Sequence, residues 1–198
     1  MALGTKPYTT PIQRASLDIA AKRVAQKLRV FLAGPYVNKT WKPDELELQS
    51  SAAKMRLSIR SHIEEQLQHE VILGEHRGVP EMGAEQFGTQ ASFAIAEYVL
   101  VNDAHAIIMI PASAGSFCEL GSWSISEDLC RKMLVIADRQ YAEDISYLRL
   151  GTLRMAINHG ATVAWCDMDD DNEVMGHVGK FVQAAHDRLM VRLVTRGE

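Results

Sequence analysis

Five short apolar runs recur along this chain, and longer stretches with helical periodicity separate them. The runs occupy residues 29–33, 70–73, 105–110, 132–137 and 161–166, and the helical stretches occupy 11–28, 43–67, 88–103, 116–125, 145–159 and 173–194. Parallel strands must be joined by crossovers of a dozen or more residues, usually helices, whereas antiparallel strands need only short turns. The alternation therefore predicts an α/β fold, a flavodoxin-like or Rossmann-like three-layer sandwich built on a five-stranded parallel sheet.

Composition limits the kinds of protein this chain can be. Its 198 residues, 47% of them hydrophobic and 23% charged, suit a single domain over 1–198 with a flexible tail at 1–10. A net charge of −4 argues against a general nucleic-acid surface and favours a small-molecule partner. Cys118, Cys130 and Cys166 lack metal-type spacing, so we expect reduced core thiols. No segment has the character of a membrane span, so we expect a cytoplasmic protein without a membrane partner.

The stretch from residue 106 to residue 123 is the most informative part of the sequence. An apolar strand at 106–110 is followed by a turn of small residues, which leaves room for a ligand near the backbone. We expect Ser116 to cap the next helix and Glu119 to lie in its first turn, above the carboxyl end of a strand, where open α/β sheets bind ligands. Compensation of the helix dipole is the alternative explanation for an acidic residue in a first turn.

Several familiar chemistries lack their sequence signatures here. Neither glycine-containing loop has the Gly-Lys-Ser/Thr of a Walker A motif or the Gly-x-Gly-x-x-Gly of dinucleotide-binding proteins. Gly-x-Ser-x-Gly is also absent, which argues against a serine hydrolase. The acidic run at 167–171 lacks the pattern of a calcium loop, and His62 and His69 lack further zinc-type ligands, so we expect no metal and no cofactor.

The remaining chemistry is that of carboxylates. Three loops, at 34–41, 74–87 and 111–119, are expected to meet at the carboxyl edge of the sheet. Breaking a glycosidic bond to a nucleobase creates an oxocarbenium-like centre that the carboxylate of Glu119 can stabilise or trap. A second acid is needed for the sugar or the leaving base; Glu97 is our candidate and Glu75 its rival, although Glu97 could equally be a solvent-facing helix residue. Tyr36 and Trp41 could stack on the base, or could simply pack their loop.

Two segments together resemble a known family. Val-Phe-Leu-Ala-Gly-Pro-Tyr at 30–36 and Ser-Ala-Gly-Ser-Phe-Cys-Glu-Leu-Gly at 113–121 are similar to nucleoside 2-deoxyribosyltransferases, and most of all to the deoxyribosyltransferase-like antiphage effectors encoded beside bacterial retrons. The resemblance extends loosely over residues 29–160. It implies that Glu119 attacks the anomeric carbon and that Glu97 contacts the nucleoside. Family members usually have Asp where this chain has His105, which favours hydrolysis over base exchange.

The resemblance completes our expectations about function. We expect an N-glycosidase that acts on nucleosides, nucleotides or NAD in bacterial antiphage defence, as a homo-oligomer and with a defence-system partner protein. A non-catalytic nucleotide sensor is the alternative, and a phosphoribohydrolase ranks third because Pro111-Ala112-Ser113 replaces its Pro-Gly-Gly. The expected substrate-binding residues are Gly34, Pro35, Tyr36, Asn38, Trp41, Glu75, His105, Ser113, Gly115 and Ser116.

Overall fold

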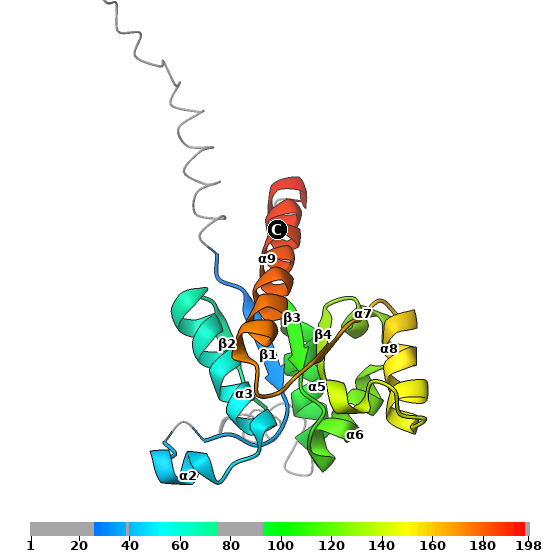
Figure 1. Cartoon of the computed structure of the whole chain (residues 1–198). Coiled ribbons are helices and arrows are strands. Elements are labelled where there is room, and N and C mark those ends of the chain that lie inside the picture. Colours follow the sequence, from blue (N-terminus) through cyan, green and yellow to red (C-terminus); the bar gives the residue numbers. More distant parts are fainter. Residues whose placement is uncertain (1–25, 39, 75–92, 197–198) are drawn as a thin grey trace, which may run out of the picture.

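A computed structural model describes residues 26–38, 40–74 and 93–196 of the chain (Figure 1). Within these residues, five parallel strands form one sheet in the order β2-β1-β3-β4-β5. The strands are β1 (Arg29–Ala33), β2 (Glu70–Ile72), β3 (Ala106–Met109), β4 (Met133–Asp138) and β5 (Thr162–Cys166). The five-stranded parallel sheet predicted from the apolar runs is therefore confirmed, with small differences at the strand ends.

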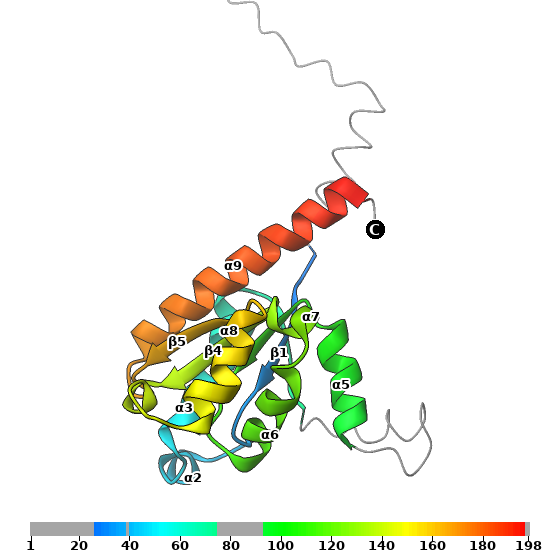
Figure 2. The same cartoon turned by 90° about the vertical axis from the view of Figure 1, so that its right-hand side faces the viewer.

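Helices cover both faces of this sheet. They are α2 (Pro43–Glu47), α3 (Ser51–Ser61), α5 (Phe93–Asp103), α6 (Ala114–Trp123), α7 (Glu127–Cys130), α8 (Arg154–Asn158) and α9 (Asp171–Arg196), with π-helical turns η1 (His62–Gln66) and η3 (Leu148–Leu153) and the 3-10 turn η2 (Arg139–Tyr141). Figures 1 and 2 show α3 and α9 on one face and α5, α6 and α8 on the other. The predicted three-layer sandwich is confirmed.

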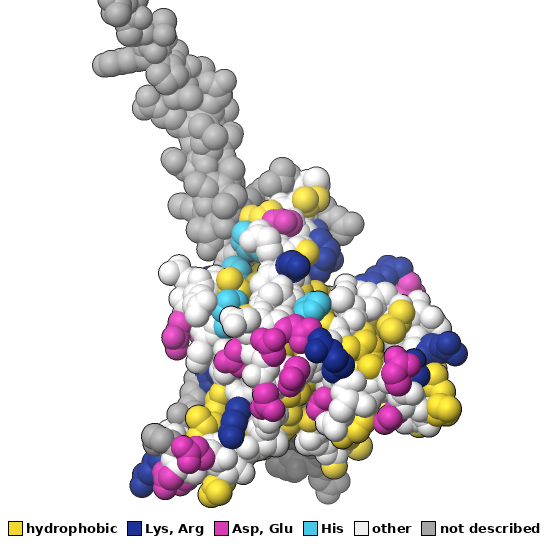
Figure 3. Space-filling view, in the orientation of Figure 1, with side chains coloured by type: hydrophobic (Ala, Val, Ile, Leu, Met, Phe, Trp, Pro, Cys, Tyr) yellow, Lys and Arg dark blue, Asp and Glu magenta, His cyan; other side chains and the backbone are white. Residues whose placement is uncertain are grey.

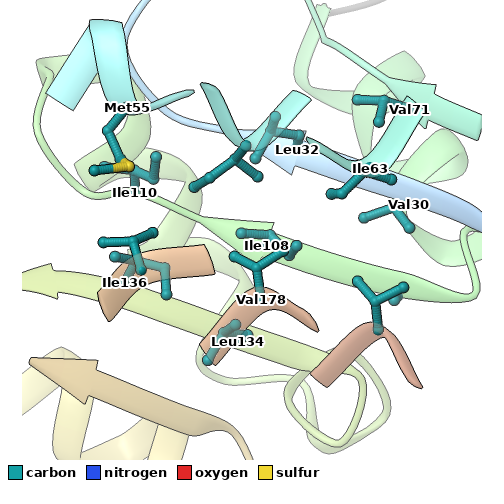
Figure 4. Packing of buried hydrophobic residues seen from close by; sticks show 14 of the residues in the cluster. Val30, Leu32, Met55, Ile63, Val71, Ile108, Ile110, Leu134, Ile136 and Val178 are labelled. Carbon is teal, nitrogen blue, oxygen red and sulfur yellow. The ribbon is translucent and has the colours of Figure 1, made fainter. Parts of the chain in front are cut away.

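Alternation along the strands divides the core into two clusters. Val30 and Leu32 of β1 face α3 and α9, whereas Phe31 and Ala33 face the opposite helix layer, because successive side chains of a strand point to opposite faces. Figure 4 shows the first cluster, in which side chains of β1, β2, β3 and β4 meet those of α3 and α9. In the second cluster, the ring of Phe31 meets that of Trp123 edge to face, with centroids 5.8 Å apart. Both faces are therefore apolar, as central parallel strands require.

The long helix predicted at 43–67 is wrong in one respect, because it is divided. α2 ends at Glu47, and α3 begins after Ser50, whose hydroxyl accepts a hydrogen bond from the Ala53 N–H at 3.3 Å. An N-cap serine satisfies one of the open N–H groups of a new helix, and this interaction favours the break. The helix ends in η1, after which Gln68 adopts a left-handed conformation with φ 57°.

Other predicted elements differ at their ends or lie outside the described residues. Residues 26–28 are not helical, so the helix predicted at 11–28 does not reach β1. The rest of that helix, the tail at 1–10, most of the loop at 74–87 and the start of the helix at 88–103 fall outside the described ranges. Gly160 follows α8 with φ 98°, as expected for a glycine that ends a helix. Cys130 and Cys166 are buried as expected, but Cys118 is exposed on α6, which corrects that prediction.

The strand order determines where a ligand can enter the sheet. β1 lies between β2 and β3, so the crossover from β1 runs to one side and the strands from β3 onward run to the other. At such a switch point the two connections diverge and leave a crevice at the carboxyl ends of the strands. Ala33 pairs with Met109 at this edge, and the turns after β1 and β3 leave the sheet side by side. Among the described helices, none combines the length and apolar character needed to cross a membrane.

Candidate active site

The turn between β3 and α6 is held by two serines. Ser113 has extended backbone dihedrals and is the N-cap of α6, and its hydroxyl accepts the N–H of Ser116 at 3.2 Å. The prediction that Ser116 caps this helix is therefore wrong. Ser113 is the cap because the helix begins at Ala114, two residues before the predicted stretch at 116–125.

Ser116 is a structural residue with no exposed surface. Its Oγ accepts hydrogen bonds from the N–H groups of Ala112 at 3.0 Å and Ser113 at 2.9 Å. The same hydroxyl donates to the carbonyl oxygen of Ser113 at 3.0 Å. A hydroxyl has one donor and two acceptor sites, so these bonds use its full capacity. Ser116 therefore shapes the turn that borders the crevice rather than acting on a ligand directly.

Glu119 lies deeper in α6 than predicted. It is the sixth residue of the helix, in the second turn instead of the first, because α6 begins at Ala114. The electrostatic effect of a helix terminus falls off within its first turn, so compensation of the dipole no longer explains this side chain well. The side chain is partly buried, and its Oε2 atom is shielded from solvent. Glu119 thus projects its carboxylate into the crevice from the side of α6 and not from its N-terminus.

Glu97 comes to the same crevice from α5, and only 7% of its surface is exposed. Gly74, two residues after the end of β2, lies against Glu97. A Cβ added at Gly74 would lie 2.1 Å from Oε1 of Glu97, which is far inside any real contact distance. The reading of Glu97 as a solvent-facing helix residue is therefore wrong, since the side chain is buried. Glycine at position 74 is what allows the carboxylate to reach this place.

Arg56 of α3 supports the crevice from below, and the sequence reasoning missed it. The residue is 2% exposed, and its guanidinium donates to the carbonyl oxygens of Leu32 at 2.5 Å, Pro35 at 2.6 Å and Gly34 at 3.3 Å. These bonds hold the end of β1 and the turn that follows it. The sequence did contain a signal for this residue. Arg56 occupies a position on the apolar face of the predicted helix, where a charged side chain is rare unless it is paired.

These side chains enclose a cavity of about 220 Å³ at the carboxyl ends of β1 and β3. Seven of the residues expected in the site line this cavity: Gly34, Tyr36, Glu97, Ser113, Gly115, Ser116 and Glu119. Arg56 and Gly74 also line it, although neither was expected. Two carboxylates, a shielded guanidinium and the start of a helix therefore converge on one small space.

Other expected residues lie near this cavity but do not line it. Pro35 is buried and contributes the carbonyl oxygen that Arg56 binds. Asn38 uses its side-chain oxygen to accept hydrogen bonds from the backbone and hydroxyl of Thr40. Trp41 packs against the core, and the ring of Tyr36, which is 63% exposed, meets it edge to face at 6.0 Å. Only Tyr36 of the two aromatic residues is thus available at the cavity, and Glu75 lies outside the described residues.

A second cavity, of about 350 Å³, lies on the other side of the turn after β3. Pro111 and Ala112 separate it from the crevice that holds Glu119. Phe117 of α6 and Tyr141 of η2 form part of its wall, and Asp138 contributes a carboxylate. A ligand in the Glu119 cavity would have to extend past Pro111 and Ala112 to reach this second space.

Comparison with known proteins identifies the family. Residues 53–194 match the family described as STM3845 retron effector protein, and this segment is most of the chain. The chain belongs to this retron effector family. A protein of Escherichia coli, provisionally named retron Ec86 ribosyltransferase/DNA-binding protein, is 36% identical to the effector over 66 residues. That match covers 33% of the effector and 22% of the relative, so the chain spans only a minor part of the relative's length.

His105 of the retron effector does not belong to the site, which corrects its prediction as a substrate-binding residue. It precedes β3, so it lies at the amino edge of the sheet, opposite the carboxyl edge that holds Glu119. Its Nδ1 accepts the N–H of Arg29 at 2.9 Å. Burial, followed by the nearby charge of Arg29, lowers the pKa of His105 below its ordinary value. The neutral ring is therefore a structural partner of β1.

One group in the described part of the effector has the composition of a metal site. The ligand atoms of Cys166, Glu173 and His177 lie within 4.8 Å of one another, at the end of β5 and the start of α9. The carboxylate of Glu173 is already engaged, since it accepts hydrogen bonds from Arg139 and from the N–H of Asp167. This group lies away from the Glu119 cavity and contributes nothing to it.

Proposed function

We propose that this retron effector is an N-glycosidase that cleaves the bond between base and sugar in nucleosides, nucleotides or NAD, and that it serves bacterial antiphage defence. The observation that carries the proposal is the convergence of Glu119 and Glu97 on one cavity at the switch point of the sheet. A pair of carboxyl groups flanking the scissile bond is what glycosidic cleavage commonly uses. The family and the ribosyltransferase name of the E. coli relative support glycosyl chemistry.

Glu119 would act on the sugar. As the bond between the anomeric carbon and the base nitrogen breaks, positive charge develops on the anomeric carbon and the ring oxygen. The carboxylate forms a bond or an ion pair with that carbon while the base leaves with the electron pair. A base that is neutral in the substrate takes up a proton as it leaves, whereas the cationic nicotinamide of NAD leaves neutral without one. Water then attacks the same carbon, which releases the sugar with a new hydroxyl group and restores the carboxylate.

Glu97 would orient the sugar or supply the proton to the base. Its side chain is buried and lines the same cavity as Glu119, and in its protonated form it would donate to the leaving base. Gly115 and Ser113 border the same space at the start of α6, where N–H groups without intrahelical partners can meet a sugar or phosphate oxygen. Glu119 would thus act on the anomeric carbon, and Glu97 on the sugar or on the proton that the leaving base takes up.

A direct assay of base release tests this proposal. The purified effector is incubated with a panel of nucleosides, nucleotides and NAD, and free base is separated by chromatography. Glu119→Gln should reduce the rate by about three orders of magnitude or more, as loss of a covalent nucleophile does. Glu143→Gln is the matched control, because that side chain is 94% exposed and should leave the rate unchanged. Equal release by Glu119→Gln and the parent would contradict the assignment.

A nucleotide-binding role without turnover is the second candidate. It would use the same cavity, where the exposed ring of Tyr36 is available to stack on a base. Calorimetry would then show nucleotide binding, with no base released over the same concentrations.

Homo-oligomerisation and a defence-system partner protein, both implied by the resemblance, remain predictions that size-exclusion chromatography and co-purification can test.

A further inference from the structure

A cleft of about 500 Å³ lies at the amino edge of the sheet, on the side opposite the Glu119 cavity. It is formed between the second half of α9, the end of α5 and the junction of α7 with β4. Five cationic side chains and two carboxylates line it, although the whole chain carries a net charge of −4. Figure 3 shows acidic side chains gathered around the first turn of α9 and basic ones beside its second half. Positive charge is therefore concentrated at one edge of an acidic protein.

Two of these cations are part of the architecture of the cleft. Lys132 donates through Nζ to the carbonyl oxygens of Val101, Asn102 and Ala104, which closes the C-terminus of α5. Arg29 binds the carboxylate of Asp103 and its carbonyl oxygen. These contacts fix the side chains of Lys132 and Arg29 at the base of the cleft. They also neutralise Asp103, one of the two carboxylates that line it.

The outer wall presents cations to solvent. Arg188 and Arg192 lie on α9 one helical turn apart, so they share a face of the helix, and both are exposed. Arg131 lines the opposite side and is also exposed, and its guanidinium forms an ion pair with Glu127 of α7. His105 adds a neutral donor: because its Nδ1 accepts the N–H of Arg29, its proton is on Nε2. The wall thus offers guanidinium groups at the spacing of one helical turn beside an N–H donor.

We propose that this cleft binds the sugar–phosphate backbone of a nucleic acid strand. Guanidinium groups bind phosphate oxygens in a bidentate manner, and cations one helical turn apart suit a chain of repeating phosphates better than a single anion. The cleft and the Glu119 cavity lie at opposite edges of the sheet, so both can be occupied at once. The proposal does not depend on glycosidase activity. The acidic net charge confines the interaction to this edge.

Fluorescence anisotropy with a labelled mixed-sequence DNA strand tests the proposal. The double variant Arg188→Glu/Arg192→Glu should weaken binding by about tenfold or more and reduce the salt dependence. Lys54→Glu/Lys180→Glu changes the net charge equally at exposed positions outside the cleft, and should keep most of the affinity. Circular dichroism checks that both variants are folded. Glu119→Gln should bind DNA as the parent does, which separates this proposal from the catalytic one.

Three results would overturn the proposal. The first is an absence of DNA binding by the parent protein even at about 50 mM salt, where phosphate contacts are strongest. The second is an equal loss of affinity in the Lys54→Glu/Lys180→Glu control, which would show that net charge alone decides binding. The third is complete displacement of the strand by ATP at an equal concentration of phosphate groups, which would make the cleft a site for free nucleotides.

Discussion

The carboxylate of Glu97 occupies the space that a side chain at Gly74 would need, since a Cβ at Gly74 would lie 2.1 Å from Oε1 of Glu97. Gly74 follows β2 by two residues, and Glu97 lies on α5. The buried carboxylate can lie here because residue 74 has no side chain. Gly74 is therefore part of the candidate active site, although it carries no chemistry of its own.

Replacing Gly74 with alanine should displace Glu97 and reduce base release. The added methyl group cannot coexist with Oε1 at the present distance, so either the carboxylate or the turn after β2 must move. We expect the rate to fall by about a hundredfold, as a displacement of about 1 Å at a catalytic group can cause. Gly121→Ala is the control, because an added Cβ there meets nothing within 4 Å. Full activity of Gly74→Ala would argue that Glu97 has no role.

Arg56→Met should destabilise the fold. It removes three hydrogen bonds to carbonyl oxygens of β1 and its turn, and a buried acceptor left without a donor costs about 1–3 kcal/mol. We expect a loss of about 3 kcal/mol in the free energy of unfolding, measured by urea denaturation. Arg56→Lys should retain part of it, since lysine keeps the charge but not the planar fork. Exposed Arg154→Met should change stability little, and an equally small effect at Arg56 would contradict the structural role.

Ser116→Ala should cost stability without abolishing chemistry. The hydroxyl holds the N–H groups of Ala112 and Ser113, so its loss should lower the free energy of unfolding by about 1–2 kcal/mol. Base release should persist at a reduced rate, because the hydroxyl has no capacity left for a nucleophilic role. Loss of activity as complete as that of Glu119→Gln, in a folded Ser116→Ala protein, would show that the hydroxyl participates in the reaction.

Stability should fall as the pH drops from about 7 towards 5, partly because of His69. Burial, followed by the charges of His186 and Lys27, lowers the pKa of His69 in the folded protein. The unfolded chain therefore takes up a proton near pH 6.5 that the folded chain still rejects, and protonation favours unfolding. His69→Asn should flatten this part of the stability profile, measured by thermal denaturation. Exposed His177→Asn should not, and identical profiles for all three proteins would exclude His69 as a cause.

The sequence predicted the sheet well because period and length are local signals. Buried parallel strands are short apolar runs, and the crossovers between them are long, so both can be read without knowing which strands pair. The division of the helix at Ser50 was missed because a cap competes with an otherwise continuous helical pattern. The start of α6 was misplaced because Ser113 and Ser116 are both able to cap a helix, and only the backbone conformation decides between them.

The sequence predicted some residues of the candidate site but misplaced or missed others. Glu119 was predicted from its place after the carboxyl end of a strand, whereas Glu97 was chosen as the second acid with support from the family resemblance. His105 was assigned to the same site because the resembled family usually has Asp there, but it precedes β3 and therefore lies at the other edge. Arg56 and Gly74 were missed because their importance lies in contacts between elements, which the pattern of a single segment does not show. Glu75 remains a prediction outside the described residues.

A crystal structure of Glu119→Gln with a bound nucleotide tests the central claim most directly. The variant should hold its substrate intact, so the position of the sugar can be seen. We expect the anomeric carbon within about 3.5 Å of the carboxamide of residue 119, the reach of a near-attack geometry, with Glu97 beside the sugar or the base. A nucleotide bound at a different edge of the sheet, with the Glu119 cavity empty, would contradict the account.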